Sequence, residues 1–273
     1  MSTPTTSAGT HRTERSGSDN LLWVMRSEWT KLWSLRSTPW TIVAMFVVTV
    51  GFAALASWGT ATHLREAAAG GTLDVTNVAL AGLLFGQLPI AVLGVLVISG
   101  EYSTGGIRSS LTAVPGRIRL LTAKAVVFTL VAVVSGLITS FVSFYVGMIF
   151  FNAHGVGVGI GEPHVLRAVI GGGLLLTASG LLGFAIGILL RHSAGAITVS
   201  VALLFVIPIV LSAIPADVVR SANKYFLSSA GERVTHVVSQ PDALGPWHGY
   251  LVFIGEVAFL LVCGAVLMVR RDA

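Results

Sequence analysis

The sequence predicts an all-α, polytopic membrane protein with six transmembrane helices. Hydrophobic residues make up 54% of the 273-residue chain and charged residues only 11%, whereas ordinary soluble domains carry about a quarter charged residues. Six stretches stay apolar over the roughly 20 residues that a helix needs to cross a bilayer. The cations gather beside these stretches, where they set topology, so the net charge of +5 does not indicate nucleic-acid binding.

The spans and the cations between them predict an orientation. The predicted spans run over about residues 40–58, 78–99, 125–151, 165–190, 194–214 and 247–269. An even number of spans places both termini on one side of the membrane. That side carries twelve of the seventeen Lys and Arg residues, so the positive-inside rule predicts that it is cytoplasmic. The connections 59–77 and 215–246 then face outward.

The chain before the first span divides into two parts. Residues 1–20 are rich in Ser, Thr and Gly and are expected to form a disordered tail. Residues 21–38 have the pattern of an amphipathic helix, with an apolar face formed by Leu22, Met25, Trp29, Leu32 and Trp33. Trp-rich helices that carry Lys or Arg lie in the membrane interface, so Trp29, Lys31 and Trp33 are the predicted interfacial residues. The alternative is a soluble helix packed on a partner.

Thr38-Pro39 is expected to end this helix, because the residue before a proline disfavours helical geometry. Residues 39–273 would then form one six-span transmembrane domain.

The segment GEYSTGGIRSSLTAVPGRIRLLTAK, at 100–124, is the sizeable cation-rich connection between spans two and three. Ile107, Leu111 and Val114 recur at helical spacing and share one face. A short amphipathic helix on a cytoplasmic loop has no core of its own and needs a partner surface. We therefore interpret this loop as the place where a cytoplasmic partner acts on the membrane domain. The candidate residues for that contact are Glu101, Ile107, Arg108, Leu111 and Val114.

Glu256 is the ionisable residue predicted to lie deepest in the membrane, near the middle of the last span. A charge at that depth costs a few kcal/mol or more, so the side chain should face the bundle interior, a wet cavity or a partner. Glu256 is therefore a candidate for the translocation path. The alternative is a neutral carboxyl group that is hydrogen-bonded to a neighbouring span.

Rows of small residues in spans two and four indicate close helix packing. Gly82 and Gly86 form one row, and Ser179, Gly183 and Gly187 form another. We expect packing faces within the bundle, with a glycine-lined path or a dimer seam as the alternative. In the outer connection, the pattern from Pro215 to Gly231 predicts an amphipathic helix that lies on or dips into the outer leaflet, with a gate-lining role as the alternative.

Several catalytic signatures are missing from the sequence. None of the three lysines lies in a Walker A motif, so we expect no ATP site of the P-loop type in this chain. There is no HExxH motif and no GxSxG motif, and the single Cys263 offers neither a disulfide nor a metal cluster. We therefore predict a protein that is not an enzyme and has no catalytic residues, no metal site and no cofactor of its own.

Two segments carry a family resemblance. RSEWTKLWSLRSTPW at 26–40 and the segment 100–124 resemble, at matching places, the permease subunits of type 2 ATP-binding-cassette (ABC) exporters, in particular the small six-span bacterial form. The resemblance covers roughly Leu21 to Arg271. It implies that residues 21–38 are the interfacial connecting helix and that about 104–114 form the coupling helix that docks on the ATPase.

The resemblance also implies a mechanism and partners. A separate ATP-binding cassette subunit, which holds the ATP and Mg, would move the coupling helix, and two permease subunits would form the translocation path as a dimer. The second permease could be identical or a paralogue, the surroundings would be the lipid of a bacterial plasma membrane, and no nucleic acid is expected. An ion-gradient-driven transporter or channel, or a non-transporting membrane anchor for a cytoplasmic partner, remains the alternative.

Overall fold

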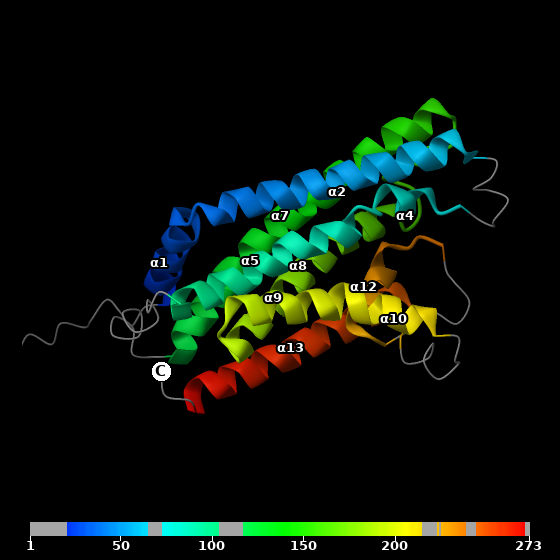
Figure 1. Cartoon of the computed structure of the whole chain (residues 1–273). Helices are drawn as coiled ribbons and strands as arrows, with labels where there is room; N and C mark the ends of the chain where they lie inside the picture. Colours follow the sequence, from blue (N-terminus) through cyan, green and yellow to red (C-terminus); the bar gives the residue numbers. More distant parts are fainter. Residues whose placement is uncertain are drawn as a thin grey trace, which may run out of the picture.

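The computed structural model describes residues 21–64, 73–103, 117–214, 223, 225–238 and 244–270, and the elements in these ranges are all helices (Figure 1). The predicted tail, residues 1–20, lies outside them. In chain order the helices are α1 (Leu21–Ser34), α2 (Ser37–Thr62), α4 (Val75–Ala79), α5 (Leu83–Ser103), α7 (Arg117–Ala153), α8 (Val165–Leu190), α9 (Ser193–Val201), the π-helix η2 (Ala202–Val206), α10 (Ile207–Ala213), α12 (Leu227–Glu232), the 3-10 helix η3 (Arg233–Thr235) and α13 (Pro246–Arg270).

The prediction of an all-α fold with six membrane spans is confirmed. Within the described ranges, α2, α5, α7, α8, the continuous α9–η2–α10 and α13 are long and apolar enough to cross a membrane. Span two begins five residues later than predicted, at Leu83, because Val75–Ala79 forms a separate short helix. Span three is longer than predicted, because α7 continues through the 37 residues Arg117–Ala153.

The junction between α1 and α2 differs from the prediction. Helix α1 ends at Ser34, and Leu35 and Arg36 connect it to α2. Helix α2 already includes Thr38 and Pro39 in its first turn. A proline fits there without cost, because the first N–H groups of a helix have no intrahelical partner. The expectation that Thr38-Pro39 ends the first helix was therefore wrong.

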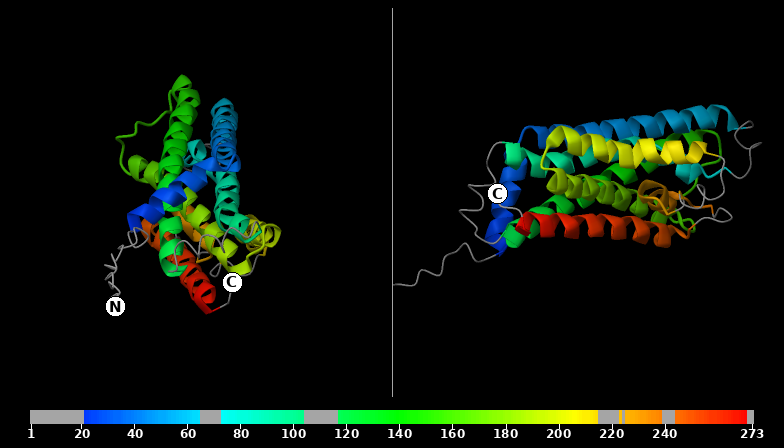
Figure 2. Two further views of the ribbon diagram at one scale, coloured as in Figure 1. Left: turned by 90° about the vertical axis from the view of Figure 1, so that its left-hand side faces the viewer. Right: turned by 60° about the horizontal axis from the view of Figure 1, so that its bottom comes forward.

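Helix α8 forms the centre of the bundle. It packs against α5, α7, α9 and α13, and 83% of its most apolar window is buried. Figure 1 shows α2 and α7 along one side of the bundle and α9, α10 and α13 along the other, with α8 between them, and Figure 2 gives two further views of the bundle. The corresponding buried shares of α2, α9–η2–α10 and α13 are only 22%, 17% and 22%, so these three spans present wide apolar surfaces.

The small-residue rows are packing faces within the bundle, as expected. A Cβ atom at Gly82 would collide with the backbone of Thr49 on α2, and one at Gly183 would collide with the backbone of Ala91 on α5. Gly94 of α5 faces the carbonyl oxygen of Gly180 on α8 in the same way. The backbones of α5 and α8 thus approach as closely as glycine permits, which is how small residues hold membrane helices together.

Span five contains a π-helical turn, η2, next to Pro208. Proline has no N–H to donate to the carbonyl four residues earlier, so the regular helical ladder is interrupted near it. The backbone N–H of Ile207 instead bonds the carbonyl of Ala202, five residues earlier. The chain from Ser193 to Ala213 remains one continuous rod with a widened turn in its middle.

The end of the bundle opposite α1 holds α4, α12 and η3 (Figure 1). Helix α12 packs on α13 and α8, where Gly231 fits against the side chains of Phe253 and Leu175. Arg167 of α8 donates hydrogen bonds to the carbonyls of Val234 and His236, at 3.1 and 2.8 Å. The segment between spans five and six is thus fixed to the bundle through its described residues.

The prediction of an amphipathic helix from Pro215 to Gly231 is tested only near its end, where the expected stop at Gly231 is wrong. Residues 215–222 and residue 224 are not among the residues that the structure describes. Helix α12 begins only at Leu227, and Gly231 lies within it rather than ending it. The glycine is required there by close packing on α13 and α8, and not by a turn. Helix α12 is therefore part of the bundle interior rather than a helix resting on the leaflet.

Asp74 ties two outer segments together, and its removal should destabilise this end. One carboxylate oxygen accepts the N–H of Asn77 and caps α4, and the other accepts the N–H groups of Val237 and Val238. We expect Asp74→Ala to cost about 1–3 kcal/mol, since it removes a helix cap and leaves two further donors unpaired. Thermal unfolding of the purified protein measures the effect. Glu162→Ala, which removes an exposed acceptor for Gly159, serves as the control and should change little; equal melting temperatures would contradict the assignment.

Candidate functional site: an ion network between α1, α5 and α7

Helix α1 lies across one end of the bundle, next to the end of α5 and the start of α7 (Figures 1 and 2). Its inward face consists of Val24, Glu28 and Leu32, which recur every four residues and are all buried. Val24 forms a small apolar cluster with Leu120 and Ala123 of α7, and Leu32 joins the main core. An acidic residue therefore occupies the middle of an otherwise apolar, buried stripe.

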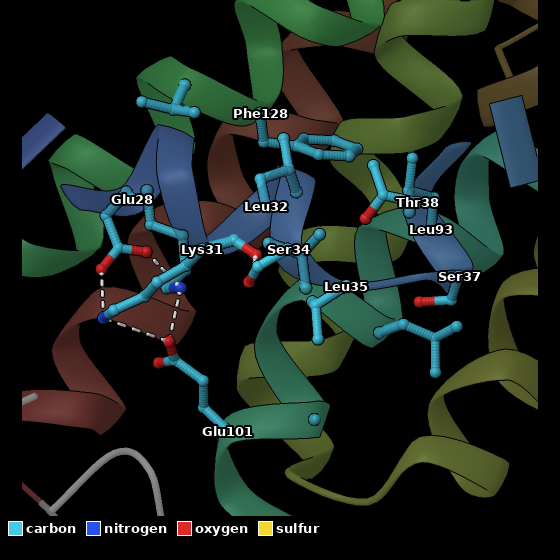
Figure 3. A pocket seen from close by; sticks show the side chains of 15 residues that line it. Glu28, Lys31, Leu32, Ser34, Leu35, Ser37, Thr38, Leu93, Glu101 and Phe128 are labelled. Atoms are coloured by element: carbon cyan, nitrogen blue, oxygen red, sulfur yellow. Dashed lines mark hydrogen bonds and ion pairs between the residues drawn. The ribbon is translucent and has the colours of Figure 1, made fainter. Parts of the chain in front are cut away.

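Glu28 is held by two lysines in a four-residue ion network, which consists of Glu28, Lys31, Glu101 and Lys124 (Figure 3). Lys124 Nζ lies 2.5 Å from Glu28 Oε2 and 2.8 Å from Glu101 Oε1. Lys31 Nζ lies 2.7 Å from Glu28 Oε1 and 3.6 Å from Glu101 Oε1. Two carboxylates and two ammonium groups thus connect α1 to α5 and α7.

The network is buried on one side and reaches solvent on the other. The side chains of Glu28 and Lys124 are 3% and 8% exposed, whereas that of Lys31 is 41% exposed. Partial burial by itself would lower the pKa of Lys31, but the hydrogen bond and charge of Glu28, together with Glu101, outweigh burial and raise it. Lys31 therefore stays charged at physiological pH, and its contribution would be lost only as the pH rises through this raised pKa.

A cavity of about 470 Å³ adjoins the network. Its walls are mainly apolar side chains of α1, α2, α5 and α7, among them Leu32, Leu93, Val97 and Phe128 (Figure 3). Because this space separates part of α1 from the bundle, the ion network and the Val24 cluster provide much of the attachment of α1. Helix α1 is thus held by the ion network and by the apolar contacts of Val24 and Leu32, and it borders the cavity.

The outward face of α1 is aromatic. Trp29 and Trp33 are 42% and 46% exposed, and their ring centroids lie 5.9 Å apart. Exposed tryptophans beside a charged lysine are typical of a helix in the membrane interface. Membrane contact by Trp29, Lys31 and Trp33 stays a prediction.

The structure brings together only part of the predicted coupling site. Glu101 and Lys31, which the sequence assigned to different sites, belong to the same ion network. Ile107, Arg108, Leu111 and Val114 lie outside the described residues, so the predicted helix over 104–114 stays a prediction. Sequence reasoning missed the roles of Glu28 and Lys124. One signal in the sequence could have indicated the burial of Glu28. It lies four residues after Val24 and four before Leu32, and these three residues form the buried face of α1.

Two further carboxylates lie away from this network. Glu256 of α13 lines an open groove, and its buried Oε2 has no hydrogen-bond partner among the residues that the structure describes. Glu232, at the end of α12, lies near the buried Gln87 amide, whose oxygen accepts a hydrogen bond from Ser179 at 2.9 Å. Burial raises the pKa of Glu232, and the neighbouring Gln87 and Arg233 only partly oppose this effect. The described residues contain no group of three or more His, Cys, Asp or Glu side chains that could hold a metal ion.

Six spanning helices, with α1 docked across one end, define a multi-pass membrane protein. The family model described as ABC-2 family transporter protein matches residues 24–214, from α1 to the end of span five. The chain therefore belongs to the ABC-2 transporter family, as the resemblance predicted, and is a membrane permease component of an ABC transporter. Such permeases are transport components rather than catalytic subunits, and the family implies an ATP-binding cassette partner in general. No curated protein matches the chain.

Proposed function

We propose that this chain is the permease subunit of an ATP-driven exporter, which works with a separate ATP-binding subunit and forms its translocation path as a dimer. The observation that supports the proposal best is the ion network, because it joins α1 to the two helices that flank the segment 104–116. The family supports the class of transporter. The sequence supports a separate ATPase, since it contains no Walker A motif.

The network offers a route for mechanical coupling. Glu101 lies near the end of α5 and Lys124 lies in the second turn of α7, so both are close in sequence to the segment that the ATPase would push. A push that changes the separation of α5 and α7 must either carry α1 along or break charge-assisted contacts at Lys124. Breaking buried ion pairs is costly, so α1 should move together with α5 and α7.

The orientation follows from the cations. Among the described residues, the end of the bundle with α1 also carries Arg191, between α8 and α9, and Arg270, at the end of α13, whereas the described part of the opposite end has fewer cations. By the positive-inside rule we place this end and both termini in the cytoplasm, in a bacterial plasma membrane. The predicted coupling segment then faces the compartment that contains ATP.

The apolar surfaces of α2, α9–η2–α10 and α13 support the proposed dimer. Each is buried over only about a fifth of its apolar window within this chain. In a membrane such surfaces contact lipid or other helices. A second permease subunit would cover some of them, and lipid would cover the rest.

The proposal is tested by expressing the chain with its candidate ATP-binding subunit, isolating the complex and measuring ATP hydrolysis and transport in lipid vesicles. We expect Leu111→Asp or Ile107→Asp to abolish ATPase binding or to uncouple hydrolysis from transport, because a buried charge would disrupt an apolar docking face. The protein should still insert into the membrane.

Val156→Asp is the matched control, since Val156 is an exposed apolar residue that follows the end of α7, far along the chain from the predicted coupling segment at the start of that helix. Its complex should retain coupled transport. Full coupling in Leu111→Asp and Ile107→Asp would refute the docking assignment, and failure of any ATP-binding subunit to co-purify with the unmodified chain would refute the proposed function.

A further inference from the structure

The groove that contains Glu256 is almost entirely apolar. It has a volume of about 510 Å³ and is open on one side. Its walls come from η2, α12 and α13, and include Leu203, Leu227, Gly255 and Phe259. Among the described residues that line it, Glu256 is the one ionisable side chain. A single acid in an apolar groove near the middle of a span defines a narrow class of ligand.

The carboxyl group of Glu256 has capacity for a ligand. Its Oε2 is buried and makes no hydrogen bond within the described part of the chain. An ionised carboxylate without a partner in such surroundings costs several kcal/mol, so a cation that neutralises it would be bound favourably. Glu256 as a whole is only partly buried and lines the groove, so its carboxyl group borders the space that a ligand would occupy.

A metal ion does not fit this groove. Ca²⁺ takes six to eight oxygen ligands and Mg²⁺ six, often including water. The described lining offers one carboxylate, and its other side chains are hydrocarbon. A molecule with one positive charge and an apolar body would match both the acid and the hydrocarbon side chains of this groove.

The aromatic ring of Phe259, which lines the groove, also favours an organic cation as the ligand. Phe259 is 67% exposed and lines the groove one helical turn beyond Glu256. An aromatic face attracts an organic cation, and the attraction increases when water is excluded. Next to Glu256, Gly255 has open space where a Cβ atom would be, so the groove extends to the α13 backbone there.

We propose that this groove binds monovalent, hydrophobic organic cations, with the charge against Glu256 and the apolar body against Phe259 and Leu203. The role of this groove as a substrate site rests on the proposed export function, whereas the binding of organic cations to the groove does not. The proposal therefore names a substrate class for the permease: lipophilic ammonium or phosphonium compounds, rather than anions or inorganic ions.

Tetraphenylphosphonium and tetraphenylborate provide a test, because they have nearly the same shape and opposite charge. Equilibrium binding of each to the purified full-length chain in detergent, corrected for empty micelles, needs no ATPase. We expect the unmodified protein to bind the phosphonium at least tenfold more tightly than the borate. Glu256→Gln should weaken phosphonium binding at least tenfold and should not weaken borate binding.

Two further variants separate charge from shape. Gly255→Leu should weaken phosphonium binding because the larger side chain fills the groove. This variant keeps the carboxyl group of Glu256. Glu232→Gln, which replaces a carboxyl group that does not line the groove, should bind like the unmodified protein. A monodisperse size-exclusion profile for each variant checks that it has folded.

Each contrary outcome has a definite meaning. Equal binding of the two probes, or unchanged phosphonium binding in Glu256→Gln, overturns the proposed site. An equal loss in Glu232→Gln would assign the effect to general electrostatics and also overturn it. Binding that follows the expected pattern in a protein that recruits no ATP-binding subunit would support the site and refute the export function.

Discussion

Lys124→Met is expected to lower the free energy of unfolding by about 3–5 kcal/mol, the range found when one partner of a buried ion pair is removed. Lys124 is 8% exposed and binds both Glu28 and Glu101, so its loss leaves the carboxylate of Glu28, which is 3% exposed, without its buried cation. Methionine keeps the apolar volume of the side chain, and the effect therefore reports on the charge. Thermal unfolding in detergent, followed by size-exclusion chromatography, measures it.

Lys31→Met is the matched control within the same network. Lys31 is 41% exposed, and ion pairs of exposed side chains contribute at most about 1 kcal/mol. A loss at Lys31 as large as the loss at Lys124 would show that burial does not decide the strength of the network.

The second large effect is expected at the seam between α5 and α8. Gly94→Ala places a methyl group against the carbonyl oxygen of Gly180 and the backbone nitrogen of Phe184. Backbone atoms of two packed helices can yield only by moving the helices apart, and overpacking of this kind typically costs 1–3 kcal/mol or more. We expect a clear fall in melting temperature and in the yield of folded protein.

Gly51→Ala is the control for this substitution. Gly51 lies inside α2, and a Cβ atom there would meet nothing within 4 Å. Alanine stabilises a helix interior by roughly 0.5–1 kcal/mol relative to glycine where there is space for it. The same substitution should thus have opposite signs at the two positions, and a fall of similar size at both would contradict close packing at Gly94.

The fold could be predicted because its signal is local. The length and continuity of the apolar stretches define six spans without knowledge of any contact. Gly183, in one of the small-residue rows, was correctly expected to pack within the bundle. The errors arose where local rules permit two outcomes: Pro39 can end one helix or begin the next, and Gly231 can end a helix or allow close packing.

The candidate site was harder to predict, because its contacts are distant in sequence. Lys124 and Glu28 are 96 residues apart, and no periodicity connects them. The neighbouring pair Glu28–Lys31 was visible in the sequence, but an i, i+3 pair on an exposed helix contributes only a few tenths of a kcal/mol. The burial of Glu28 makes the difference, and burial depends on how α1 is placed against α7.

The glycine contacts between α5 and α8 also restrict how this protein can change shape. Two helices whose backbones touch cannot slide or rotate against each other without steric overlap, so α5 and α8 must behave as one rigid body. Opening and closing of a pathway would then require movement of the spans with the least buried surface, α2, α9–η2–α10 and α13, relative to the α5–α8 pair. Cross-links placed across the α5–α8 seam should accordingly be harmless to transport, whereas cross-links that fix α13 to η2 across the groove between Leu203 and Leu260 should arrest it.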